Sequence, residues 1–187
     1  SMTASPCVLV VEDEAELAEL FAEWLSEEYE VRIATSGEEA LERIDEDVSV
    51  VLLDRLMPGI SGDEVLERIR DRGLSVRVAM VTAVEPDFDV LEMPFYDYLC
   101  KPVDREDVRA VVDQQRRILA YETLGEYFRV ESTRAVLEAE TGPERRERHE
   151  EYAEAADRAA RLESRARRLL EDDAVLDRFD RVGREER

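Results

Sequence analysis

The stretch from Val48 to Asp54, Val-Ser-Val-Val-Leu-Leu-Asp, is the most hydrophobic run in the chain and ends abruptly at a carboxylate. Four further short apolar runs occupy residues 7–11, 29–34, 76–81 and 95–100. Strands that are apolar along their whole length are typical of a parallel sheet with helices on both faces. We therefore predict an α/β fold, namely a doubly wound, five-stranded parallel sheet.

The segments between these runs have the apolar spacing of helices. In the first of them, one face is expected to carry Leu17, Leu20, Phe21, Trp24 and Leu25. Ser36 offers an N-cap for the second helix, and Glu39, three residues later, completes a capping box for a helix to about Asp45. A third helix, which bears Val65, Leu66 and Ile69, is expected to stop near Gly73.

From Asp104 onward the pattern is helical throughout. Asp104 and Asp107 can cap a long helix, from about 104 to 140, whose apolar positions include Val108, Val111, Val112, Ile118, Leu119, Tyr121, Leu124, Phe128 and Val136. The break at 141–143, Thr-Gly-Pro, precedes a second helix with closely spaced alanines between Tyr152 and Leu170. A short last piece is suggested by Val175, Leu176, Phe179 and Val182.

These patterns predict a C-terminal α-helical hairpin that follows the sheet domain. We place the first domain at 6–120 and the second at 121–187, with the long helix bridging the two. No apolar run is long enough to cross a bilayer, and no secretory signal is evident, so we expect no membrane association.

The chain carries 48 acidic and 26 basic residues, a net charge of −22, and Lys101 is its only lysine. Residues 1–103 carry 25 acidic and 8 basic residues (net −17), whereas residues 104–187 carry 23 and 18 (net −5). An acidic excess repels phosphate backbones and argues against strong non-specific binding of nucleic acid. Many carboxylates and few lysines are typical of a halophile's surface, where salt screens self-repulsion.

The two cysteines, Cys7 and Cys100, fall at opposite ends of predicted strands, and nothing in the pattern pairs them. The single histidine, His149, sits in a charged helix and is expected to be a solvated surface residue. Without a cluster of these residue types, we expect no zinc site, and a reducing cytoplasm suits the free thiols.

Polar side chains follow four of the predicted strands, at the point where each strand ends. Glu12 and Asp13 follow the first strand, Asp54 the third, Thr82 the fourth and Lys101 the fifth. In a parallel sheet with right-handed crossovers, the carboxyl ends of the strands lie along one edge, where such sheets bind ligands. We therefore expect these five side chains to converge.

Neighbouring carboxylates repel one another, and a small hard cation such as Mg²⁺ relieves this repulsion. Asp54, partly neutralised by the ion, then becomes a plausible nucleophile toward a phosphoryl group, while Lys101 and Thr82 contact phosphoryl oxygens. Taken one at a time, each residue also has an ordinary structural explanation. Glu12 and Asp13 can be acids in the first turn of a helix, and Asp54 a turn residue at the end of a strand. Thr82 can be a residue that simply favours strands, and Lys101 an ordinary surface lysine. Their common location, and the use of the sole lysine there, favour the functional interpretation.

Four segments closely resemble the receiver domain of response regulators: Val10-Val11-Glu12-Asp13-Glu14, Leu52 through Gly59, Val81-Thr82-Ala83 and Tyr98-Leu99-Cys100-Lys101-Pro102. The resemblance covers about residues 6 to 120 and implies a CheY-like, flavodoxin-like sheet of order 2-1-3-4-5. It also implies Asp54 as phosphoacceptor and a sensor histidine kinase as partner. Mg²⁺ would be held by Glu12, Asp13, Asp54 and the backbone carbonyl of Leu56.

The same resemblance implies that Thr82 and Tyr98 act as the switch pair, that Lys101 contacts phosphate, and that the Lys101-Pro102 bond is cis. One departure concerns the stretch from Thr82 to Lys101, which is short for a receiver and contains Pro86 and Pro94. We expect a short or irregular helix around residues 85–93. This puts in doubt the pairing face that many DNA-binding relatives form there.

The residues after 120 resemble the HalX domain that follows receivers in halophilic archaea. One hypothesis is an interaction or dimerisation module, coupled to the receiver through the long helix that begins at Asp104. The alternative is direct DNA binding through Arg145, Arg146, Arg148, Arg158, Arg161, Arg165, Arg167 and Arg168. Because acids interleave these arginines and no helix-turn-helix is recognisable, we favour the interaction module and a homodimer.

An enzymatic alternative is a phosphatase of the aspartyl-phosphate kind. Such enzymes usually carry a second acid two residues after the nucleophile, and this position is Leu56. We therefore expect a phosphoacceptor in a signalling system rather than an enzyme with turnover.

Overall fold

The computed structural model of the protein describes residues 5–147 and 149–170. The chain divides into two compact units, Ser5–Arg116 and the residues from Arg117 onward, and each is described by itself. The domain boundary expected after residue 120 and the observed division both fall within one long helix, α4 (Arg105–Glu140).

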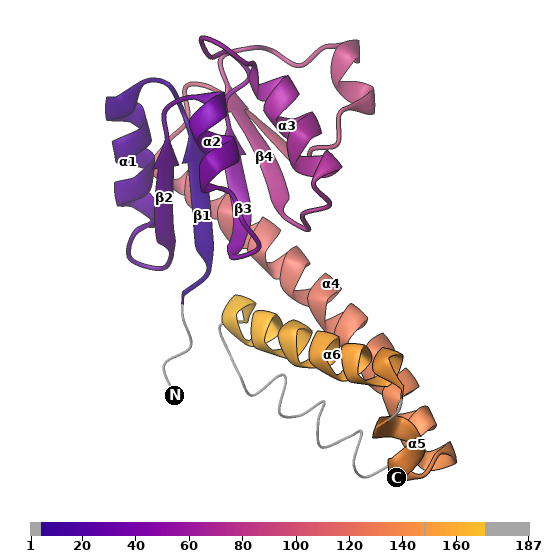
Figure 1. The fold of residues 1–187 in the computed structure, drawn as a ribbon. Coiled ribbons are helices and arrows are strands. Elements are labelled where there is room, and N and C mark those ends of the chain that lie inside the picture. The colour runs from indigo at the N-terminus through magenta and orange to yellow at the C-terminus, as the bar shows by residue number, and fades with distance from the viewer. Residues whose placement is uncertain (1–4, 148, 171–187) are drawn as a thin grey trace. The chain divides into compact units, whose positions relative to one another are not determined.

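The first unit is built on one five-stranded parallel sheet of order β2-β1-β3-β4-β5 (Figure 1). Its strands are β1 (Cys7–Val11), β2 (Glu30–Ala34), β3 (Val48–Leu53), β4 (Arg77–Thr82) and β5 (Asp97–Cys100). The predicted fold class and strand order are confirmed. Strands β1, β3 and β4 are buried along their whole length, as expected for strands covered on both faces.

The helices of this unit are α1 (Ala15–Leu25), α2 (Gly37–Arg43), α3 (Gly62–Asp71), the 3₁₀ helix η1 (Phe88–Glu92) and the start of α4. Ser36 caps α2 by accepting a hydrogen bond from Glu39 N, as predicted. Asp104 and Asp107 each accept a hydrogen bond from the other's backbone nitrogen at the start of α4. The expected short fourth helix is confirmed, because η1 spans only five residues.

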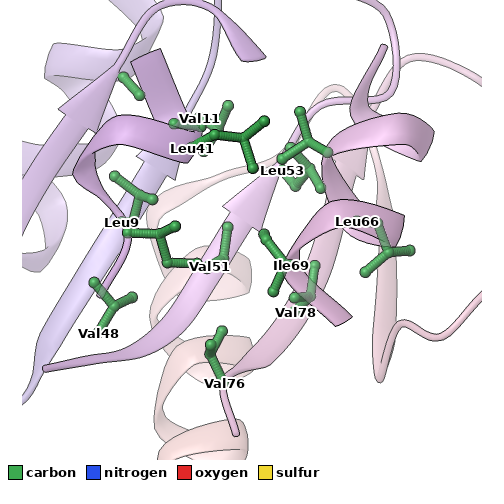
Figure 2. Close-up of a cluster of buried hydrophobic side chains, with 14 of the residues drawn as sticks. Leu9, Val11, Leu41, Val48, Val51, Leu53, Leu66, Ile69, Val76 and Val78 are labelled. Carbon is green, nitrogen blue, oxygen red and sulfur yellow. The ribbon is translucent and has the colours of Figure 1, made fainter. Parts of the chain in front are cut away.

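Two apolar cores lie on opposite faces of the sheet. On one face, residues such as Leu9, Val51 and Leu53 pack against Leu66 and Ile69 from α3 (Figure 2). The other face packs against α1 and the first turns of α4, through Phe21, Leu25, Val108, Val111 and Val112. Alternate side chains of each strand thus enter different cores, which is the doubly wound arrangement.

Leu20 departs from the prediction, since it is 39% exposed. The buried stripe of α1 consists of Ala18, Phe21 and Leu25. At 3.6 residues per turn, Leu20 lies roughly 200° around the helix from Ala18, on the solvent side.

The second unit is a helical hairpin made by α4 from Arg117 onward and α6 (Glu150–Leu169), with α5 (Pro143–Glu147) between them. Leu119 and Ala120 pack with Leu169, whereas Leu124 packs with Ala166. Farther along, Arg134 Nη1 bonds to Tyr152 Oη at 3.3 Å. Positions rise along α4 as they fall along α6, so the helices are antiparallel, as predicted.

Tyr121 and Val136, which the sequence placed in the apolar pattern of α4, are 66% and 63% exposed. The hairpin buries only the stripe of α4 that faces α6, and this stripe includes Leu119, Leu124 and Tyr127. The last piece predicted from Val175 to Val182 lies outside the described residues. None of the described helices is both long and apolar enough to cross a membrane.

Candidate functional site

The carboxyl edge of the sheet brings the predicted site residues into register. Val11, at the end of β1, pairs with Leu53 at the end of β3, so Glu12 and Asp54 follow at the same level. Backbone hydrogen bonds continue past the strands, from Asp54 N to Val11 O at 3.1 Å and from Lys101 N to Thr82 O at 2.8 Å. The positions of these side chains are therefore determined by the sheet itself.

Three carboxylates gather at this edge. Glu12, Asp13 and Asp54 each offer an oxygen atom within 4.8 Å of the others, and this is the only such group of three metal-ligating side chains among the described residues. Glu12 and Asp54 are buried, whereas Asp13 is more exposed. The sequence prediction that these acids converge is confirmed.

Lys101 joins two of the carboxylates. Its Nζ donates to Asp54 Oδ2 at 2.8 Å and to Glu12 Oε1. The other oxygen of Asp54, Oδ1, accepts a hydrogen bond from the backbone nitrogen of Leu56 at 3.1 Å. The nucleophile proposed from the sequence is therefore held through both of its oxygens.

The local charges shift the ionisation of this group. Burial, reinforced by the negative charge of Asp54, raises the pKa of Glu12 to about 7, although the Lys101 ammonium opposes the shift. Burial works against the charged form of Lys101, but its hydrogen bonds to Asp54 and Glu12 outweigh this and raise the pKa of the ammonium. The site thus holds three acids and one ammonium, which bonds two of them, so it retains excess negative charge when the acids ionise.

This donor set fits a small, hard divalent cation. Carboxylate oxygens are the ligands that Mg²⁺ prefers, and the ion commonly binds one or two of them together with waters and phosphate oxygens. Glu12, Asp13 and Asp54 supply such oxygens, and this group contains no sulfur or imidazole ligand. Leu56 lies next to them through its backbone bond to Asp54.

Thr82 and Tyr98, the predicted switch pair, are connected through Val84. Thr82 is fully buried at the end of β4, and its Oγ1 accepts a hydrogen bond from Val84 N at 3.3 Å. Tyr98 donates from its hydroxyl to Val84 O at 2.5 Å and packs edge-on against Phe95. Both residues thus bond to the loop that follows β4, and their role as a switch stays a prediction.

The Lys101-Pro102 peptide bond is cis, as expected. Two residues near the site escaped the sequence analysis. A side chain on Gly62 would place its Cβ 2.0 Å from the backbone oxygen of Asp54, so the start of α3 can approach the nucleophile only through a glycine. Arg55, which is itself buried, forms ion pairs with two partly exposed acids, Asp63 and Asp89.

Neither cysteine belongs to the site. Cys7 is buried at the start of β1, where burial raises the pKa of its thiol to about 11, and Cys100 is exposed; both are free. His149 is exposed at the start of α6, as predicted.

The sequence model of the family described as the response regulator receiver domain matches residues 8–113. The chain belongs to this family. The receiver is followed by a second match, to the HalX domain, at residues 117–182.

Relatives of this receiver protein carry regulatory names. A Haloferax volcanii protein named as a candidate transcriptional regulator is 50% identical over 146 residues, which are 77% of this chain and 25% of that protein. The transcriptional regulatory protein YrkP of Bacillus subtilis, named as uncharacterized, is 36% identical over 120 residues, or 62% of this chain and 52% of that protein. The chain thus spans about a quarter to a half of these relatives' lengths.

Solved receivers have the same fold. The response regulator TrrA of Thermotoga maritima, in complex with Mg²⁺ and BeF, is 33% identical and superposes with a TM-score of 0.53. The match covers 58% of this chain and 97% of that chain. The BeF₃-activated receiver domain of DrrB is 27% identical, with a TM-score of 0.55, 59% of this chain covered and 97% of that chain.

Proposed function

We propose that this protein is a two-component response regulator that accepts a phosphoryl group on Asp54. The observation that carries the proposal is the cluster of Glu12, Asp13 and Asp54, with the chain's only lysine bonded to the predicted nucleophile. The proposal extends the family membership, because receivers are the domains on which response regulators are phosphorylated.

In the proposed reaction, an oxygen of Asp54 attacks phosphorus, and the bond between phosphorus and the donor's leaving group breaks, with its electrons departing on that group. Lys101 stays beside Asp54 and offsets the charge of the incoming phosphoryl oxygens, while the Thr82 hydroxyl can donate to one of them. Glu12, Asp13, Asp54 and the Leu56 carbonyl would hold Mg²⁺, which supplies further charge neutralisation when bound. The product is an aspartyl phosphate, so the protein acts as an acceptor rather than as an enzyme with turnover.

The proposed donor is a sensor histidine kinase, and the proposed setting is the cytoplasm. The relay would run through α4, because this helix packs on the receiver sheet with its first turns and continues into the HalX domain. Phosphorylation would shift the population between two arrangements of this helix. The relatives named as transcriptional regulators support an output in transcription control.

For the HalX domain we propose interaction with a second copy of the chain. Three of its arginines are engaged by acids within the hairpin: Arg134 with Glu131, Arg158 with Glu126 and Arg167 with Glu163. Side chains paired in this way present less free positive charge to a phosphate backbone. Direct DNA binding through these helices remains the second candidate, supported by the relatives' names.

Labelling with acetyl phosphate and Mg²⁺ tests the phosphoacceptor. The wild-type chain is expected to gain one phosphoryl group by intact-mass measurement, and Asp54→Asn to gain none. Asp71→Asn, an exposed acid at the end of α3, is the matched control and should label normally. Full labelling of Asp54→Asn would show that the nucleophile is assigned to the wrong residue.

Two measurements address the output. Molar mass by light scattering, with and without beryllofluoride, is expected to show a dimer in the presence of this phosphoryl mimic. DNA affinity across a salt series separates the alternatives, because direct binding to phosphates predicts a steep inverse dependence on salt.

A further inference from the structure

Arg55 directly follows the proposed phosphoacceptor and is a buried cation, only 8% exposed. Its guanidinium contacts Asp63 through two bonds, Nε to Oδ1 at 3.0 Å and Nη2 to Oδ2 at 2.9 Å. The same Nη2 donates to Asp89 Oδ2 at 2.6 Å, and Nη1 lies 3.5 Å from the Tyr98 hydroxyl. One side chain therefore joins α3, η1 and β5.

From Tyr98 the hydrogen bonds lead to the hydroxyl of Thr82. The Tyr98 hydroxyl donates to the Val84 carbonyl, and the Val84 nitrogen donates to Thr82 Oγ1. A threonine hydroxyl has a single proton. Because Oγ1 already accepts from Val84, that proton can be directed toward an acceptor such as a phosphoryl oxygen.

The short helix η1 is held by Arg55, through Asp89, and by Met93, which follows it and packs against the core. None of the five residues of η1 is buried, and Phe88 and Leu91 are 85% and 77% exposed. A single turn of 3₁₀ helix whose own residues are not buried has little stability of its own. The ion pair between Arg55 and Asp89 therefore ties this segment to the residue beside the nucleophile.

We propose that Arg55 is a positioning residue for phosphoryl capture. It holds η1 through Asp89, and it holds the Tyr98–Val84–Thr82 chain, in the arrangement that receives a phosphoryl group at Asp54. The inference rests on the proposed function of Asp54. If the loop after Thr82 is already ordered, a phosphoryl group can bind without the loss of conformational entropy that ordering the loop would require.

Guanidinium geometry explains why an arginine occupies this position. Its planar fork bonds Asp63 through two parallel hydrogen bonds and still has donors for Asp89 and Tyr98. A lysine ammonium is a compact charge and cannot span these partners at the same time. The contrast with Lys101, which contacts two carboxylates from one atom, is one of geometry rather than charge.

The test compares two truncations on the same short helix. Asp89→Ala removes the contact with Arg55. Glu92→Ala is the matched control, because Glu92 is exposed on η1 and its side chain has no hydrogen bond or ion pair with any part of the chain that the structure describes. Each variant of the full chain is titrated with beryllofluoride in excess Mg²⁺ by calorimetry, and separately with Mg²⁺ alone.

Asp89→Ala is expected to weaken beryllofluoride affinity by about two- to fivefold, the effect of losing an ion pair whose acid is exposed to solvent. Glu92→Ala should stay close to wild type. Mg²⁺ affinity should be unchanged in both variants, because Glu12, Asp13 and Asp54 keep their contacts; a general structural defect would lower both affinities.

Two further variants check the same network. Arg55→Lys is expected to share the loss of beryllofluoride affinity despite keeping the charge. Tyr98→Phe, combined with Asp89→Ala, is expected to weaken binding by less than the product of the single effects, since both act through one guanidinium.

Two results would overturn the inference: wild-type beryllofluoride affinity in Asp89→Ala, or equal losses in Asp89→Ala and Glu92→Ala. If the wild-type chain bound no beryllofluoride and took no label from acetyl phosphate, the proposed function itself would fail, which is a distinct outcome.

Discussion

At the carboxyl edge of the receiver sheet, three carboxylates gather near one ammonium that bonds two of them, whereas in the helical hairpin the described ion pairs match arginines with glutamates. The first arrangement is mostly buried and retains negative charge, which can attract a cation and then a phosphoryl group. The second is partly exposed and its charges are paired, so it contributes little chemistry. In a chain with 48 acids, what distinguishes a site is charge that remains uncompensated in a buried place.

The largest expected difference between the two units is in packing. Leu53→Ala in the fully buried β3 is expected to cost about 4 kcal/mol in free energy of unfolding. Leu124→Ala in the narrow hairpin seam should cost about 2 kcal/mol, because that site can collapse more easily. Urea unfolding of both variants measures this. Equal losses would mean that the seam is packed as tightly as the receiver core.

A charge-preserving change at the site comes next. Lys101→Arg is expected to lower the rate of labelling by acetyl phosphate at least tenfold, roughly 1.4 kcal/mol or more, because a planar guanidinium cannot occupy the position between Asp54 and Glu12. Labelling kinetics by intact mass provide the measurement. A wild-type rate would remove the argument based on the single lysine.

The pH dependence of Mg²⁺ binding tests the uncompensated charge directly. Because the pKa of Glu12 is raised to about 7, this carboxyl is protonated below that pH and must release its proton when the cation binds. Mg²⁺ affinity is therefore expected to fall as pH drops below 7, by up to about tenfold per pH unit.

Calorimetry between pH 6 and 8 measures this dependence. Glu12→Gln should bind Mg²⁺ more weakly, and its Mg²⁺ affinity should no longer depend on pH in this range. Asp13→Asn should also bind Mg²⁺ more weakly, but its affinity should still fall as the pH drops. An unchanged slope in Glu12→Gln would assign the proton to another group.

The smallest effect is expected in the hairpin. Arg158→Gln removes an exposed ion pair with Glu126 and should change the free energy of unfolding by less than about 1 kcal/mol. A much larger loss of free energy, measured by urea unfolding, would show that this ion pair contributes substantially to the stability of the hairpin. Glu126→Gln, which breaks the same pair from the other side, should behave alike.

Much of the receiver could be predicted because its strands are recognisable in the sequence as short, continuous apolar runs. Val48–Leu53 is a strand in the structure with the same bounds that the apolar run suggested. Once the strands are parallel, the residues that follow them must meet, so Glu12, Asp54 and Lys101 could be grouped without coordinates. The short η1 also followed from Pro86 and Pro94.

Helix faces were harder to predict. Leu20, Tyr121 and Val136 fit an apolar pattern but are exposed. An apolar residue is buried only where another element packs over it, and the sequence pattern does not show where that happens. The network of Arg55 was missed for a related reason: Asp89 lies 34 residues away, and nothing in either segment marks the pairing.

The sequence by itself determined the parallel sheet, the helical hairpin and the identity of the acids, hydroxyl and lysine at one sheet edge, because apolar runs and helical periodicity can be read locally and their alternation indicates a parallel sheet. Only the tertiary structure decided which of the many charges are paired and which are buried. Charge pairing depends on distances between segments remote in the chain, and those distances exist only after the cores on both faces of the sheet have formed.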